Sequence, residues 1–126
     1  MPEVTINYLI AGENPDRTLQ VTIDNSNSVS ELKAQILREN RDVFASEFPS
    51  QLTLGKVSIS RRDDEELEIL RNYYYSIRTR ISIENDLGGT ELPPDDNISR
   101  YFRRNRQDYY IELVVKGRLR SRQIES

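Results

Sequence analysis

Two stretches near the start of the chain alternate between apolar and polar residues. In residues 4–10 (VTINYLI) and again in residues 18–24 (TLQVTID), every second residue is apolar. Residues 11–16 lie between them and favour a turn, in part because Pro15 cannot continue a strand ladder. Because a period of two is typical of a strand with one buried face, the pattern predicts an antiparallel hairpin.

The next stretch has the period of a helix. In Ser28-Val29-Ser30-Glu31 the Ser28 hydroxyl and the Glu31 carboxylate are placed to accept hydrogen bonds from free N–H groups of a first turn, which is a capping box. We expect a helix from about residue 29 to residue 39, ending near Asn40. Its apolar stripe consists of Val29, Leu32, Ile36 and Leu37.

Residues 51–59 (QLTLGKVSI) predict a short strand, a break at Gly55-Lys56 and a second short strand. Leu52 and Leu54 are expected to face the core, as aliphatic residues at that spacing would in any half-buried strand. At the break, Lys56 is expected to be an exposed turn cation.

Residues 61–76 open with acidic side chains, which suit a helix N-terminus, and Leu67 and Leu70 are spaced for one helical face. Most of the tyrosines at 73–75 and 109–110 are interpreted as structural. Residues 77–83 (IRTRISI) alternate and predict a strand, which would offer a route to self-association if it lay at a sheet edge.

Towards the end of the chain, Ile98 and Phe102 are spaced to turn inwards from a short helical turn. Residues 109–115 (YYIELVV) predict the last strand. After Gly117 the apolar pattern stops, so residues 118–126 are expected to form a basic, flexible tail.

Composition argues against an enzyme. The 126 residues include no Cys and no His, which excludes thiolate chemistry, histidine-dependent triads and His-ligated zinc. We therefore predict no catalytic, cofactor-binding or metal-binding residues. From the first residues we expect no conventional signal peptide, and the sequence contains no run of about 20 apolar residues of the kind that spans a membrane.

Charge is divided unevenly along the chain. Residues 1–98 hold 10 Lys/Arg and 18 Asp/Glu, whereas residues 99–126 hold 8 and 3. The net charge of −3 disfavours tight nonspecific binding of nucleic acid. A candidate basic patch nevertheless comprises Arg100, Arg103, Arg104, Arg106, Lys116, Arg118, Arg120 and Arg122.

Four segments resemble parts of ubiquitin. Residues 18–36 are similar to its second strand and helix, and residues 51–56 to its third strand. Residues 97–101 resemble its short helical turn, and residues 110–116 its last strand.

This resemblance implies an α+β fold of the ubiquitin-like β-grasp type, in which a mixed sheet wraps one long helix. It implies a single domain over residues 1–117, with an insertion of about residues 60–96 after the third strand. Conjugation is not expected, because no Gly-Gly pair follows the last strand.

Within that superfamily the chain resembles the N-terminal header domain of Crinkler effectors, known from oomycetes and fungi. Those headers carry a Leu-Phe-Leu-Ala-Lys motif at the third strand. This chain has Leu52-Thr53-Leu54-Gly55-Lys56 there, and Ile98-Ser99-Arg100-Tyr101-Phe102 is similar to the family's turn before the last strand. The last strand, Glu112-Leu113-Val114-Val115, lacks the family's His and closing Pro.

The resemblance implies a non-enzymatic protein-interaction and delivery module for an effector. Such a module would be secreted without a conventional signal peptide, act in the host cytoplasm or nucleus, and bind an unidentified protein partner. Ubiquitin binds partners through an apolar patch on its third and fifth strands. The corresponding positions, Thr53, Glu112 and Val114, form the candidate interaction surface, with altered specificity because only Val114 is apolar.

The alternative hypothesis is a nucleic-acid or nuclear-import adaptor that uses the Arg-rich C-terminal segment. The two hypotheses differ in salt dependence, because phosphate contacts weaken steeply as salt rises.

Overall fold

The computed structural model describes residues 3–45, 48–60, 65–75, 82–102 and 110–120. The fold is α+β, with one mixed five-stranded sheet. Its elements are β1 (Glu3–Ile10), β2 (Leu19–Asp24), α1 (Val29–Glu39), η1 (Pro49–Gln51), β3 (Thr53–Ser60), α2 (Glu65–Tyr75), α3 (Ile83–Leu87), β4 (Thr90–Glu91), η2 (Ile98–Arg100) and β5 (Tyr110–Lys116).

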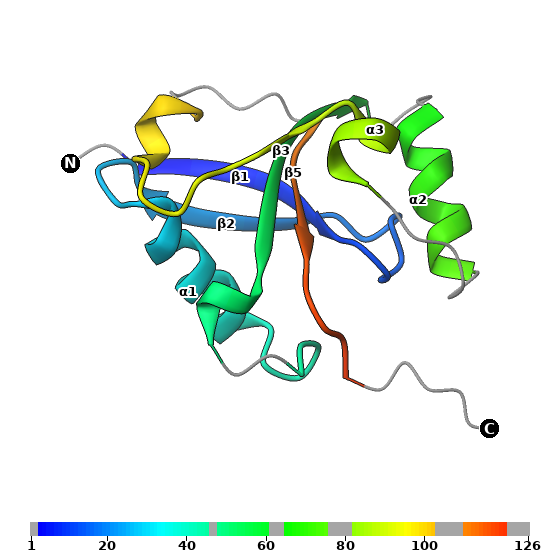
Figure 1. Ribbon diagram of the computed structural model, residues 1–126, viewed down its shortest axis with the longest axis horizontal. Coiled ribbons are helices and arrows are strands. Elements are labelled where there is room, and N and C mark those ends of the chain that lie inside the picture. The colour runs from blue at the N-terminus through cyan, green and yellow to red at the C-terminus, as the bar shows by residue number, and fades with distance from the viewer. Residues whose placement is uncertain (1–2, 46–47, 61–64, 76–81, 103–109, 121–126) are drawn as a thin grey trace.

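The first and last strands, β1 and β5, lie side by side in the middle of the sheet (Figure 1). Strand order is β2-β1-β5-β3-β4. β1 pairs antiparallel with β2, which confirms the predicted hairpin, and parallel with β5, where Tyr8 lies opposite Leu113. β3 runs antiparallel to both β5 and β4.

Helix α1 covers one face of the sheet, which we call the inner face. The predicted capping box is present: the Glu31 N–H donates to the Ser28 hydroxyl at 3.2 Å, and the Ser28 N–H donates to the Glu31 carboxylate at 2.7 Å. Asn40 ends the helix. The predicted apolar stripe is buried, with Leu32 and Ile36 fully enclosed. The apolar stripe of α1 and the inward-facing apolar residues of the strands therefore pack into one core.

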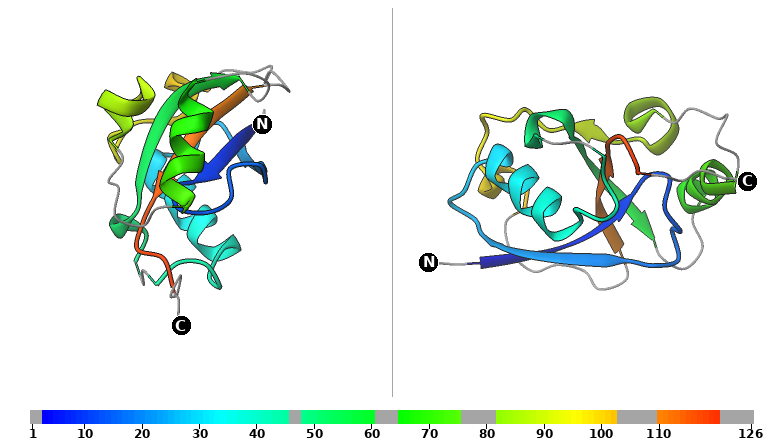
Figure 2. Two further views of the ribbon diagram at one scale, coloured as in Figure 1. Left: turned by 90° about the vertical axis from the view of Figure 1, so that its right-hand side faces the viewer. Right: turned by 90° about the horizontal axis from the view of Figure 1, so that it is seen from below.

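Helix α2 covers the opposite face, which we call the outer face (Figure 2). Leu67 and Leu70 of α2 are buried against it, as their spacing predicts. The outer cluster consists of Leu9, Ala11, Val57, Ile59, Leu67, Leu70, Leu87, Ile111 and Val114. Both faces of the central strands are thus buried.

Two element predictions were wrong. Residues 53–60 form one strand without a break at Gly55-Lys56, and the irregularity is a shift in register between Lys56 and Ile59 against β5. Ile83 begins helix α3 with Ser82 as its N-cap, so the predicted strand does not extend to it. Residues 77–81 of that prediction lie outside the described residues.

The chain stays paired beyond Gly117, where a tail was expected to begin. The Ala45 N–H donates to the Arg118 carbonyl at 2.7 Å, and the Arg120 N–H donates to the Val43 carbonyl at 2.7 Å. Residues 118–120 are therefore part of the folded structure, which corrects the predicted start of the tail. The rest of that tail, residues 121–126, lies outside the described residues.

Candidate interaction groove

The motif Leu52-Thr53-Leu54-Gly55-Lys56 directs its residues to alternate faces of the sheet. Leu52 and Leu54 are buried in the inner core, as predicted. Thr53 is half-buried, and Gly55 lies against Ile83 of α3 on the outer face. The two leucines are thus structural, and the outward positions are the ones left to bind a partner.

Lys56 is not an exposed turn cation. It lies within β3, is half-buried, and places its Nζ 5.6 Å from the centroid of the Phe102 ring. A cation over an aromatic face at this distance contributes about 0.5–2 kcal/mol, depending on its hydration. This contact joins the motif to Phe102, the second residue after the end of η2.

Of the three candidate surface residues, Thr53 lines two hollows in the described surface. Val114 has no exposed surface because α2 packs over it, so its assignment to an accessible patch was wrong. Glu112 is half-buried and lines neither of the two hollows that Thr53 lines.

Two adjoining hollows form what we call the groove. The larger, about 570 Å³, is lined by Thr53, Tyr73, Ser82, Ile83, Glu84, Asp86, Glu91 and Lys116. The smaller, about 270 Å³, is lined by Ala11, Gln51, Thr53, Tyr73, Lys116, Gly117 and Arg118. They share Thr53, Tyr73 and Lys116, so β3, α2 and β5 meet at the middle of the groove.

Helix α3 forms one wall of the groove and is held by its own cap. The Asn85 N–H donates to the Ser82 hydroxyl at 3.1 Å, and the Ser82 N–H donates to the Asp86 carboxylate at 2.8 Å. Gly55 lets α3 approach the sheet, because a Cβ there would lie 2.4 Å from Cγ2 of Ile83. The position of α3 against β3 therefore requires a glycine at residue 55, because any larger residue would clash with Ile83.

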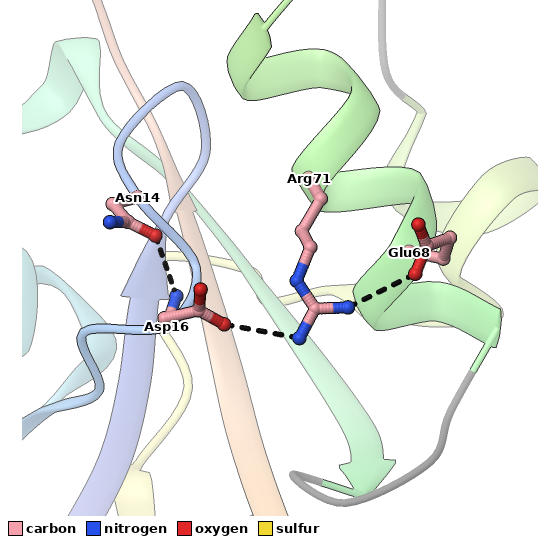
Figure 3. A network of polar contacts seen from close by, with 4 residues as sticks. All are labelled: Asn14, Asp16, Glu68 and Arg71. Carbon is pink, nitrogen blue, oxygen red and sulfur yellow. Dashed lines mark hydrogen bonds and ion pairs between the residues drawn. The ribbon is translucent and has the colours of Figure 1, made fainter.

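Helix α2 forms the other wall and is tied to the β1–β2 loop (Figure 3). Arg71 places Nη2 3.1 Å from the Asp16 carboxylate and Nη1 3.0 Å from the Glu68 carboxylate. The Asp16 N–H in turn donates to the Asn14 side-chain oxygen at 3.0 Å. The hydrogen bond to Asp16 raises the pKa of the Arg71 guanidinium further above its usual range.

The described members of the predicted basic patch do not form one surface. Arg100 lies in η2, where its guanidinium is 3.9 Å from the Asp96 carboxylate, whereas Lys116 and Arg118 line the groove. Figure 1 places η2 and the end of β5 far apart in the molecule. Arg120 donates to the Arg41 carbonyl at 3.1 Å. The remaining members, Arg103, Arg104, Arg106 and Arg122, lie outside the described residues.

Sequence reasoning missed most of the groove. Tyr73 belongs to a group of tyrosines that were mostly interpreted as structural; it packs against the outer cluster and also lines both hollows. Glu84, Asp86 and Glu91 belong to a stretch with no recognised motif. The one local signal was the sequence Ser82 to Asp86, a serine followed by acidic residues that suits a helix start.

Within the described residues, no three His, Cys, Asp or Glu side chains are placed to hold a metal ion. None of the helices found there is long and apolar enough to cross a membrane.

The described residues thus form a small α+β domain, with α1 on the inner face, a second helical layer on the outer face and a polar groove at the edge of that layer. The chain belongs to the family of Crinkler effector protein N-terminal domains, whose family model matches residues 4–116. Comparison with curated proteins gave no significant match, and neither did comparison with solved structures.

Proposed function

We propose that this chain is a non-enzymatic protein-interaction module that serves an effector in host-cell targeting. The groove carries the proposal, because α2, α3, β3 and β5 present polar and aromatic side chains there around a common hollow. Membership of an effector N-terminal family supports the link to an effector.

We also propose that the module is a ubiquitin-like β-grasp with an insertion after β3. A hairpin, a long helix and a last strand that returns beside the first are present in that order. Helices α2 and α3 fall within the proposed insertion, residues 60–96. On this proposal, the insertion converts a bare sheet face into a covered face with a groove at its edge.

This arrangement favours a binding mode different from that of ubiquitin. Val114 is buried beneath α2, and Gly55 is covered by Ile83. An apolar patch of the ubiquitin kind would need these strand positions open to solvent. We therefore propose that partners contact the groove. Thr53 belongs both to the groove and to the surface predicted by analogy with ubiquitin.

The residues available support a role without catalysis. The chain lacks His and Cys, so no side chain titrates near neutrality at its ordinary pKa. The acidic residues of the groove rim, Glu84 and Glu91, are exposed, a setting that does not by itself create an acid–base pair.

Proximity labelling in host cells tests the proposed interaction. Thr53→Arg should remove a set of labelled host proteins, because it places a bulky cation in the middle of the groove. Thr22→Arg is the matched control, since Thr22 is an exposed residue of β2 away from the groove. Both variants should keep the circular dichroism spectrum of the unchanged chain.

Two results would contradict the proposal. One is that the Thr53→Arg and Thr22→Arg variants label the same host proteins as the unchanged chain. The other is that a partner lost in the Thr53→Arg variant is covalently altered by the unchanged chain in a purified mixture, as measured by intact-protein mass spectrometry. That result would identify an enzyme acting on the partner.

A further inference from the structure

The two ends of the groove carry opposite charge. Glu84, Asp86 and Glu91 line the larger hollow at the α3 and β4 end. Arg118 lines the smaller hollow at the other end, and Lys116 lines both. The groove is therefore acidic at one end, mixed in the middle and basic at the other.

The acidic end is built on short, fixed elements. Glu84 and Asp86 follow the Ser82 cap of α3, and the Ser82 N–H holds one oxygen of the Asp86 carboxylate at 2.8 Å. Glu91 is exposed on β4, which pairs with β3 next to the floor of the groove. The Asp86 carboxylate is thus held by the cap, and Glu84 and Glu91 extend from backbones that belong to α3 and β4.

The basic end is fixed through the backbone. The Arg118 carbonyl accepts from the Ala45 N–H at 2.7 Å, while the side chain of Arg118 is exposed. Gly117 next to it is packed so tightly that a Cβ would lie 2.6 Å from Leu52. Arg118 is therefore presented from an anchored backbone.

Between the ends, the groove offers a neutral surface. Tyr73 supplies an aromatic side chain that is half-buried, Thr53 a hydroxyl, and Ile83 an apolar wall. A site whose parts are already positioned loses little conformational entropy when a ligand binds, which favours recognition of a flexible segment.

Building on the proposed function, we propose that the groove binds an extended segment of the partner protein that carries opposite charges at its two ends. A Lys or Arg side chain of that segment lies at Glu84 and Glu91, and an Asp or Glu side chain lies at Arg118. A neutral or aromatic residue between them contacts Tyr73. Electrostatic complementarity of this kind favours partner segments with the matching charges and fixes the direction in which the segment lies in the groove.

Four five-residue peptides test the charge pattern, with binding followed by amide chemical shifts in NMR spectra. The first has the sequence Arg-Ala-Tyr-Ala-Glu with blocked ends, which separates the charges by roughly 13 Å in an extended chain. The second has the same composition with Arg and Glu adjacent. The third has Arg at both ends, and the fourth has Glu at both ends.

We expect the first peptide to bind with a Kd of about 0.1–1 mM. It should bind about three- to fivefold more tightly than the adjacent-charge peptide, because each exposed charge contact has a modest effect. The preference should shrink in 1 M salt. Shifted amides should lie at residues 53, 73, 82–86, 91 and 116–118.

A charge exchange in the protein provides the decisive comparison. The variant E84K/E91K should bind the doubly acidic peptide about tenfold more tightly than the unchanged chain does. The matched variant E3K/D95K changes the net charge equally at exposed positions that do not line the groove, and it should keep the original preference. R118E should instead favour the doubly basic peptide.

Equal binding of the four peptides would overturn this inference, and so would an equal change of preference in E84K/E91K and E3K/D95K. The proposed function has a separate readout. If the peptides fail but Thr53→Arg still removes host partners, the charge pattern is wrong and the interaction groove stands. If Thr53→Arg has no effect on partners, both proposals fail.

Discussion

The two faces of the sheet are built differently. The inner face packs against α1, a capped helix that follows the first hairpin directly, and it buries large side chains such as Ile6, Leu32 and Leu54 completely. The outer face buries a smaller cluster of residues, including Leu9, Ile111 and Val114, under helices contributed by the stretch between β3 and β4.

Because of this difference, we expect the inner face to supply most of the stability, whereas the groove proposed to bind partners lies on the outer face. The inner face has a continuous core in which helix and strand periods coincide, and such cores supply most of the stability of a domain. The outer face is covered by separate short elements, and the groove opens where α2, α3 and the ends of β3 and β5 meet. The proposed binding site therefore lies on the less continuous layer.

The sharpest test of the comparison removes one leucine from each face. Leu54→Ala should lower the free energy of unfolding by about 4 kcal/mol, and Leu70→Ala by about 2 kcal/mol. Leu54 is enclosed in the larger inner cluster, whereas Leu70 belongs to the smaller outer cluster, and we expect α2 to shift into the space left when Leu70 is shortened. Urea denaturation followed by circular dichroism measures both. A larger loss for Leu70→Ala would reverse the ranking of the two faces.

Adding a methyl group to β3 beneath α3, at Gly55, should have the next largest effect on stability. Gly55→Ala should cost about 2 kcal/mol, because its Cβ would lie 2.4 Å from Cγ2 of Ile83. The combination with Ile83→Ala should be less destabilising than the sum of the single changes, by about 1 kcal/mol. Strictly additive losses in denaturation would show that Gly55 does not set the position of α3.

The inner face could be predicted from sequence because its signals are local. The Ser28 cap, the stripe of α1 and the alternation of β1 and β2 each lie within a dozen residues. The outer face could not, because which helix covers it depends on long-range packing. Val114 was expected to face solvent, yet Leu113, Val114 and Val115 are three consecutive buried residues of β5, the pattern of a strand covered on both faces.

The groove was harder to predict for a related reason. Gly55 was interpreted as a break in the strand, since glycine is common in turns. The structure shows another use of glycine, the close approach of α3 to β3. Thr53, Lys116 and Arg118 were singled out, but their grouping with Tyr73 and Glu91 depends on contacts between distant segments.

A buried polar contact on the inner face predicts a dependence on alkaline pH. Tyr8 is almost fully buried and accepts a hydrogen bond from Asn40 at 2.9 Å, and burial raises the pKa of its hydroxyl. The folded state therefore holds this proton more tightly than the unfolded chain does. The resulting stabilisation is complete below the ordinary tyrosine pKa of about 10 and is lost as pH rises through the folded-state pKa.

Tyr8→Phe should remove this part of the pH dependence and cost about 1 kcal/mol at neutral pH, the value of one hydrogen bond. Asn40 would still donate to the Ile36 carbonyl at 2.8 Å, so the end of α1 should persist. Urea denaturation between pH 8 and pH 11 compares the variant with the unchanged chain. Parallel curves for the two would show that Tyr8 does not contribute to the alkaline loss.

The smallest effect is expected from the exposed ion pair on the outer face. Arg71→Ala removes the link from α2 to Asp16 in the β1–β2 loop. Exposed pairs contribute about 0.2–1 kcal/mol, so global stability should fall by no more than that. Amide hydrogen exchange should show the change locally, with faster exchange in α2 and unchanged exchange in α1.

Arg38→Ala, an exposed change on α1, is the matched control. Equal loss of protection in both helices would show that the two layers open together, and the distinction between a continuous core and a separately attached outer layer would then be wrong.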